Sequence, residues 1–135
     1  MPQPSASCKR ALADATAAFP KRSRAADGLM GDAAHQKRKS DHNQGNAFDL
    51  THDPENGVDC DFFSQLAVLD SRVTYVIWNK RIYNVAMADK GWRPYKGKNG
   101  HTHHMHVSVK AALRDIASPW PWAALESPAA QDSTR

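Results

Sequence analysis

The sequence predicts an α+β domain in which a small, mainly antiparallel sheet is flanked by helices. Three observations favour this class. The chain has 135 residues, the size of one ordinary domain. Two β-branched and aromatic runs, 72–78 and 81–85, flank a two-residue turn and therefore predict a hairpin. The helix-like and strand-like segments do not alternate along the chain, as they would in a doubly wound parallel sheet.

The N-terminal part is expected to contain one helix followed by a basic connection. Residues 1–8 are rich in Pro and Ser, which predicts disorder. The Ala-rich run 9–19 predicts a helix that ends before a proline. Residues 21–39 contain six Lys or Arg between turn signals, which predicts an irregular connection. The folded domain is expected to cover 9–118, and prolines predict an irregular tail over 119–135.

The middle of the chain is expected to supply the sheet and a second helix. Apolar residues near helical spacing predict the helix, whereas Gly, Pro and Asn predict the turn and the exposed loop. The expected elements are a strand at 46–51, a turn at 53–57, a helix at 59–69, the hairpin strands at 72–78 and 81–85, a loop at 91–100 and a strand at 103–110.

Composition excludes several classes of protein. Hydrophobic residues make up 41% and charged residues 24%, as in a globular domain and unlike a fibrous or collagenous chain. Only Cys8 and Cys60 are present, which predicts free thiols without a disulfide framework. No apolar run has the length of a signal-peptide core or a membrane span, so we expect cytoplasmic synthesis without a signal peptide and no stable membrane insertion. The net charge of +4 favours an anionic partner without choosing among nucleic acid, teichoic acid and cell wall.

Four of the seven histidines lie between His101 and His106. Side chains alternate between the two faces of a strand, so His104 and His106 are expected on one face, about 7 Å apart, and His103 on the other. Neutral imidazole is a common zinc ligand, and a pair can supply one ligand and one acid/base group. A His-rich tract that binds metals without being a site is the alternative interpretation.

A second group of polar residues lies at 40–49, where His42 and Asp49 are separated by a bend that contains Gly45. Such a bend can bring the side chains of His42 and Asp49 close together. A catalytic zinc needs three protein ligands and one open position, and these two residues with one histidine of the later cluster complete that number. Bound zinc lowers the pKa of its water to about 7 and polarises a peptide carbonyl.

This group resembles the motif Ser-x-His-x-x-Gly-x-Ala-x-Asp of the zinc D-Ala-D-Ala carboxypeptidases and L-alanyl-D-glutamate peptidases. The five matching positions are Ser40, His42, Gly45, Ala47 and Asp49. The resemblance covers roughly residues 25–110 and implies that His42, Asp49 and His106 bind zinc. One position departs from the pattern, because those enzymes carry a catalytic Glu three residues before the third ligand and this chain has His103 there.

The later cluster is similar to the His-x-x-His-x-His pattern of the penicillin-insensitive murein endopeptidases, at His101, His104 and His106. Lysostaphin-like enzymes and hedgehog domains share a His-x-His pair whose second His binds zinc. The resemblance implies that His104 is the acid/base residue or oxyanion partner, and that His101 supports the site or contacts substrate. The arrangement around His42 to Asp49, together with the later segment from Trp92 to Tyr95, also resembles small lysin domains encoded by phages and prophages.

Three further residues are candidates for substrate binding. Arg38 precedes the first expected ligand, and its guanidinium could hold a stem-peptide carboxylate bidentately. Ser40 belongs to the matched motif. Tyr95 lies in the loop that leads into the histidine strand, where loops commonly contact substrate. The tryptophans, by contrast, are expected mainly in the core.

We therefore expect a monomeric zinc metallopeptidase that hydrolyses peptidoglycan stem peptides or cross-links, has no nucleic-acid partner and belongs to a phage or prophage lysin. Two alternatives stay open at this point. The excess of Lys and Arg over Asp and Glu, together with the string Asp41-His42-Asn43, suggests a one-metal nuclease. The missing Glu allows a zinc-binding module that recognises the wall without catalysis.

Overall fold

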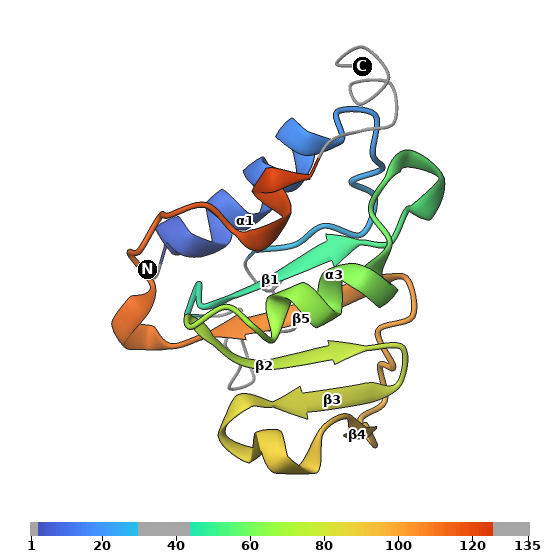
Figure 1. Ribbon diagram of the computed structural model, residues 1–135, viewed down its shortest axis with the longest axis vertical. Coiled ribbons are helices and arrows are strands. Elements are labelled where there is room, and N and C mark those ends of the chain that lie inside the picture. Colours follow the sequence, from blue (N-terminus) through green and yellow to red (C-terminus); the bar gives the residue numbers. More distant parts are fainter. Residues whose placement is uncertain (1–2, 30–43, 126–135) are drawn as a thin grey trace.

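The computed structural model describes residues 3–29 and 44–125. Figure 1 shows an antiparallel sheet with helices packed against it, which confirms the predicted α+β class. The strands are β1 (Ala47–Thr51), β2 (Val73–Trp78), β3 (Arg81–Asn84), β4 (Arg93–Pro94) and β5 (His104–Val109). Their order across the sheet is β1-β5-β2-β3-β4, so the last strand in the sequence lies between the first and the second.

The helices begin at capped residues. Helix α1 (Ala6–Ala18) starts where the Ser5 side chain accepts a hydrogen bond from the backbone N–H of Cys8. Helix α3 (Cys60–Ala67) starts where the Asp59 side chain accepts from the N–H of Asp61. No helix within residues 3–29 and 44–125 is long and apolar enough to cross a membrane.

The expected disorder of residues 1–8 is wrong for the described residues 3–8. The helix starts three residues before the predicted position, because Ser5 caps it and Cys8 is fully buried against the core. Cys8 and Cys60 are both buried free thiols, as expected.

The segment after residue 118, predicted as an irregular tail, packs into the core as far as Trp122. Trp120 precedes the short 3-10 helix η4 (Pro121–Ala124), and Trp122 lies within it. The two side chains are 1% and 0% exposed. Their indole N–H groups donate to backbone carbonyls of α1, and the Trp120 backbone N–H donates to the Asp14 carboxylate at 2.8 Å. The two indole rings bury a large apolar area while their N–H groups keep hydrogen-bond partners. These contacts hold the C-terminal segment against the core.

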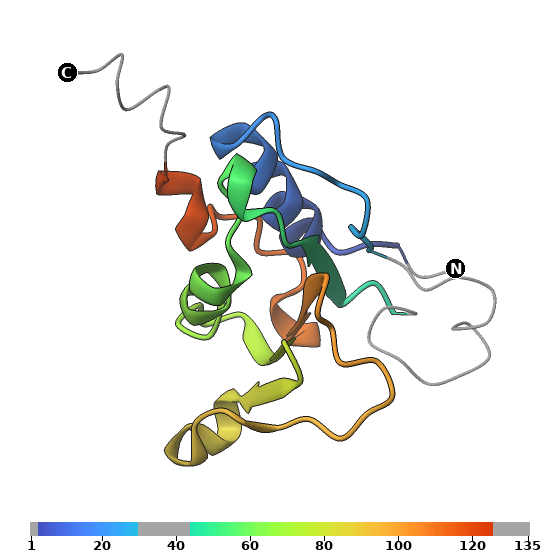
Figure 2. The same ribbon diagram turned by 90° about the vertical axis from the view of Figure 1, so that its right-hand side faces the viewer.

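The two faces of the sheet differ. Helix α1 packs against β1 and η4, and α3 packs against β2 and β5. Phe48 and Leu50 of β1 and Met105 and Val107 of β5 belong to the core on this helix side. Alternation therefore places Asp49 and its neighbours on the opposite face. Figure 2 shows α3 on one side of the sheet and the loop before β5 on the other.

The predicted hairpin between β2 and β3 is confirmed. Asn79 and Lys80 have φ values of 51° and 66°, the left-handed region that a two-residue hairpin turn of this hand requires. Their backbone N–H groups donate to the carbonyls of His101 and Gly100, at 2.9 and 2.7 Å. The turn thereby holds the loop that leads into β5.

Arg72 ties the start of β2 to the C-terminal segment. Its guanidinium pairs with the Asp70 carboxylate at 2.7 Å and donates to the carbonyls of Ile116 and Ser118. It also lies 4.1 Å from the centre of the Trp120 ring. The Arg72 side chain is 4% exposed, so these contacts exclude water.

We predict that Arg72→Met lowers the free energy of unfolding by about 3 kcal/mol, because it leaves the buried Asp70 carboxylate without its cation. Arg10→Met is the matched control, since the Arg10 side chain is 39% exposed and its pair with Asp14 should contribute below about 1 kcal/mol. Urea unfolding of both variants measures the difference. Equal losses would contradict the structural role of Arg72.

Candidate metal centre

Asp49 lies at the centre of the polar cluster on the face of the sheet opposite the helices. In the β1–β5 pairing Asp49 is opposite His106, and Thr51 is opposite His104. One carboxylate oxygen, Oδ1, lies 3.2 Å from His106 Nδ1, and the other, Oδ2, lies 3.6 Å from His104 Nε2. Each oxygen of a single carboxylate thus has its own imidazole.

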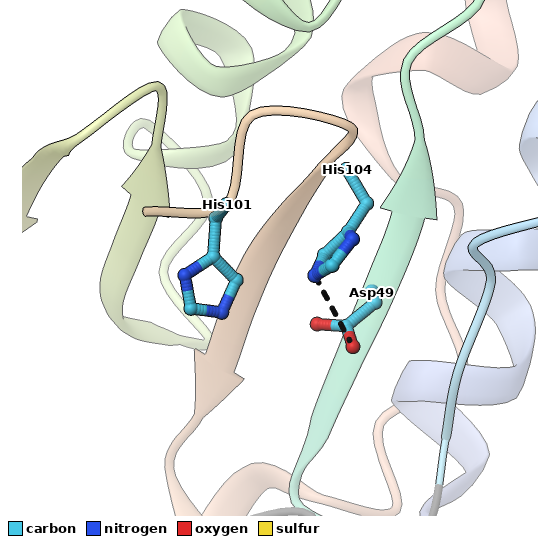
Figure 3. Close-up of side chains that lie close together, drawn as sticks. All are labelled: Asp49, His101 and His104. Carbon is cyan, nitrogen blue, oxygen red and sulfur yellow. Dashed lines mark ion pairs between the residues drawn. The ribbon is translucent and has the colours of Figure 1, made fainter. Parts of the chain in front are cut away.

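His101 completes the cluster from the loop before β5. Its ring centre is 5.0 Å from that of His104 and 5.5 Å from that of His106. Figure 3 shows His101 and His104 directed toward the Asp49 carboxylate. The backbone of His101 has φ 53°, and its N–H donates to the Asn99 side chain. This left-handed conformation is uncommon for residues other than Gly, and such strain is found frequently at functional sites.

The His101 ring is neutral at neutral pH. Burial, followed by the nearby His106 and His104, lowers the pKa of His101 to about 4. Its Nδ1 atom is buried and has no hydrogen-bond partner among the described residues. A neutral ring with a free nitrogen is the form in which histidine binds metals or accepts a proton.

The cluster can hold a divalent metal ion. Asp49, His101 and His104 each offer one donor atom, and these atoms lie within 4.8 Å of one another. A tetrahedral ion with bonds of about 2.0 Å separates its ligand atoms by about 3.3 Å, so modest side-chain rotations suffice. The unpartnered nitrogen of His101 is a second observation that fits a ligand in this position.

His106 is held on three sides. Its Nε2 atom lies 2.8 Å from the Ser108 hydroxyl, and its ring stacks on Tyr75 with the planes 18° apart. The Ser108 hydroxyl can donate or accept, so His106 Nδ1 can donate its proton to the Asp49 carboxylate or, in the other tautomer, offer a lone pair to a metal ion. The sequence Asp49–His106–Ser108 has the connectivity of a nucleophilic triad, but Ser108 is fully buried. No substrate reaches this hydroxyl, which excludes serine nucleophilic catalysis.

A strand-like segment at Gly28 supports Asp49 from the outer side of β1. Gly28 and Asp49 exchange two backbone hydrogen bonds, of 3.1 and 2.8 Å. A Cβ atom on Gly28 would lie 3.3 Å from Asp49 Oδ2, so a larger side chain would crowd the carboxylate. The preceding Asp27 is anchored by the Arg22 guanidinium at 2.8 Å and by the Thr51 hydroxyl at 2.7 Å.

The structure brings together four of the predicted site residues. Asp49, His101, His104 and His106 form one cluster, and His104 and His106 share a face as alternation predicts. His103 is exposed and lies outside the cluster, also as expected. The Tyr95 ring packs edge-on against His101, with ring centres 5.9 Å apart, which places it beside the site. Arg38, Ser40 and His42 lie outside the described residues.

Sequence reasoning missed several residues that shape the cluster. Tyr75 stacks on His106, Ser108 fixes the same ring, and Gly28 pairs with Asp49. Ser108 follows His106 by two residues, so strand alternation could have placed it on the same face. Gly28 and Tyr75 carry no such signal, because their positions depend on long-range pairing.

A protein-family model described as VldE, C-terminal domain, matches residues 3–106. The chain belongs to this family. The matched part of this VldE C-terminal domain extends from before α1 to His106 and so includes the whole described cluster. No curated protein and no solved structure matches the chain.

We predict that Asp49→Ala abolishes tight binding of a divalent metal, because Asp49 is the group that every candidate ligand set shares. His103→Ala is the control and should retain the metal, since this side chain lies outside the cluster. Metal analysis after dialysis, with cobalt absorption spectra as a second readout, compares the variants. Undiminished metal in Asp49→Ala would remove the proposed centre.

A further prediction concerns Asp27 and pH. Burial would raise the pKa of Asp27, but hydrogen bonds from Arg22 and Thr51 outweigh it and hold the pKa below its ordinary value of 3.8. The ionised carboxylate therefore contributes stability that is complete above this value and is lost as the pH falls through the lower pKa of the folded state. Asp27→Asn should cost about 2 kcal/mol at neutral pH and progressively less below about pH 4. Urea unfolding across this range tests it, and a difference independent of pH would contradict it.

Proposed function

We propose that this chain is a zinc-dependent peptidase that hydrolyses amide bonds in the stem peptides or cross-links of bacterial peptidoglycan. The observation that carries the proposal is the convergence of Asp49 with His101, His104 and His106 on the face of the sheet opposite the helices. A carboxylate and several neutral imidazoles are the ligand types of a catalytic zinc site. The peptidoglycan substrate rests on the resemblance of the two His-containing motifs to wall peptidases.

Within this proposal, Asp49 and His106 bind zinc together with His42. The 3.2 Å between Asp49 Oδ1 and His106 Nδ1 agrees with the separation of about 3.3 Å expected for two ligands of a tetrahedral ion. A ligating imidazole usually donates its other N–H to a fixed acceptor, and the Ser108 hydroxyl provides one for His106 at 2.8 Å. These two features support His106 as a ligand, whereas the donor atoms that lie within 4.8 Å of one another belong to Asp49, His101 and His104.

His104 is the proposed acid/base group. Its ring is oriented by the Asp49 carboxylate, and it stands beside His106 on the same face. His101 lines the same space with a neutral ring and an unpartnered nitrogen, where it can accept a hydrogen bond from water or substrate. When bound, zinc supplies a Lewis acid that polarises the carbonyl and lowers the pKa of water to about 7. Tyr95 borders this space and can contact the bound peptide.

We predict that the protein with zinc releases muropeptides from purified sacculi, and that a chelator stops the release. His104→Ala should keep its zinc but lose about 10²- to 10⁴-fold in turnover, the usual contribution of a positioned acid/base group. His103→Ala is the matched control, because it removes a neighbouring imidazole that lies outside the cluster. Mass spectrometry of the products identifies the bond.

Three outcomes would change the proposal. Loss of zinc from His104→Ala would make this residue a ligand instead of the acid/base group. Binding to sacculi without any release of peptides would favour a wall-recognition module. Cleavage of plasmid DNA with no effect on walls would favour a nuclease, the class that the basic balance of the chain also suits.

A further inference from the structure

A pocket lies between helix α3 and the β2–β3 hairpin. Its volume is about 300 Å³, at the lower end of the range for small-molecule sites. The residues that line it come from α3, from the hairpin and from the position before β4, and they include Asp61, Gln65, Trp78, Asn79, Arg81 and Trp92. Asp61, Gln65, Asn79 and Arg81 are exposed and Trp92 is partly exposed, so a ligand can reach these side chains from solvent.

Two tryptophans give this pocket an aromatic surface. The Trp78 indole N–H donates to Asp61 Oδ1 at 2.8 Å, and the centre of the Trp78 ring lies 4.7 Å from that of His52. The centre of the Trp92 ring lies 5.6 Å from that of Tyr83. Both indoles are therefore held in place by neighbouring side chains of the protein, and they present apolar area to a ligand at low conformational cost.

The polar groups of the pocket keep hydrogen-bonding capacity that the described part of the chain does not use. Gln65 Nε2 donates to the Asp61 backbone carbonyl and Asp61 Oδ1 accepts from Trp78, which leaves Gln65 Oε1 and Asp61 Oδ2 available. The side chains of Asn79 and Arg81 make no hydrogen bond or ion pair to the described residues. Acceptors from α3 and donors from the hairpin thus line one shared space.

The lining favours a neutral ligand with several hydroxyl groups. Asp61 and Arg81 are the charged residues among the described lining, one of each sign, so their charges balance. A hydroxyl group both donates and accepts, and a ligand with several of them can use the carboxylate, the amides and the guanidinium together. The C–H face of a sugar ring is apolar and can pack on an indole. These features together describe a pyranose ring.

The pocket and the histidine cluster lie at the same end of the sheet. Trp78 and Arg81 are cross-strand partners on the helix face, whereas the cluster lies on the opposite face. The backbone N–H of Asn79 donates to the carbonyl of His101 at 2.9 Å, so the hairpin turn contacts both places. Figure 1 shows this turn and the start of β5 at the same end of the sheet. A branched ligand can therefore place one part in the pocket and another at the cluster.

We propose that this pocket binds one uncharged pyranose ring, an N-acetylated sugar of the glycan strand whose stem peptide reaches the histidine cluster. Trp92 packs against the ring, Asp61 and Gln65 accept hydrogen bonds from its hydroxyls, and Asn79 and Arg81 donate to its oxygens. The glycan strand as the source of the sugar rests on the proposed function. The sugar class itself follows from the two tryptophans, the unused donors and acceptors, and the balanced charge.

The test uses the trisaccharide of N-acetylglucosamine as the probe. It is titrated into the ¹⁵N-labelled protein and followed by NMR through the indole N–H signals of the four tryptophans. We expect saturable shifts of the Trp78 and Trp92 signals. Trp120 and Trp122 are internal controls, since both are buried and their N–H groups bond to backbone carbonyls. Equal shifts of all four signals, or no shift at about 10 mM sugar, would overturn the site.

Two variants remove expected contacts, and each has a matched control. Trp92→Ala and Arg81→Gln should each weaken the Kd for the trisaccharide about tenfold, the usual effect of losing a packed aromatic ring or a charged hydrogen bond. Phe62→Ala removes an exposed aromatic ring of α3, and Lys90→Gln removes a nearby cation. Neither residue belongs to the described lining, so both controls should bind as the wild type does.

Arg81→Gln keeps the test decisive if Trp92→Ala does not fold, because Arg81 is exposed at the hairpin. An undiminished affinity in Arg81→Gln would overturn the assigned site. Cellotriose has the same rings without the acetamido groups, and equal binding of cellotriose would overturn the assignment to an N-acetylated wall sugar.

The remaining outcomes separate this inference from the proposed function. Binding of the trisaccharide at Trp78 and Trp92 without release of peptides from sacculi would support the pocket and contradict the peptidase. Cleavage of a free stem peptide by a protein that does not bind the trisaccharide would support the peptidase and overturn the pocket.

Discussion

The antiparallel pairing of β1 with β5 is the constraint on which the rest of the structure depends. It joins Asp49 and His106, which are 57 positions apart in the chain, as direct cross-strand partners. The same pairing closes the core on the opposite face, where Phe48 and Val107 are both fully buried. Because side chains alternate along both strands, hydrophobic packing on the helix side sets the register of the polar cluster on the other side. A shift by one residue would bury the histidines and expose the core, so the stability of the fold and the geometry of the site cannot be changed independently.

A second constraint places His101, which lies outside the strand. The turn at Asn79 and Lys80 uses left-handed backbone conformations without glycine, and its N–H groups hold the carbonyls of the incoming loop. His101 itself has a positive φ and a buried, unpartnered nitrogen. Three non-glycine residues in this region of φ would be costly without compensation. The hydrogen bonds of the hairpin turn supply part of this compensation. A bound ion or substrate would supply a partner for the unpartnered nitrogen of the His101 ring.

The charges of the molecule are distributed in relation to this geometry. Asp49 and its histidines lie toward β1 and β5, whereas Lys and Arg dominate β3, β4 and the loop that follows them. The sheet therefore carries its candidate metal ligands toward one edge and its cations toward the other. Such an asymmetry would orient a bound anionic ligand.

The sequence by itself determined the α+β class, the bounds of most strands to within about two residues, and the shared face of His104 and His106, because these depend on local periodicity and turn chemistry. Composition also indicated the N-terminal helix, but not its start, since the cap at Ser5 and the burial of Cys8 depend on packing with the C-terminal tryptophans. Only the tertiary structure decided that β5 lies between β1 and β2, and that Tyr75 and Gly28 support the cluster. Strand order and register across the sheet are set by contacts between distant segments, and no local pattern in a single sequence encodes which of these segments will meet.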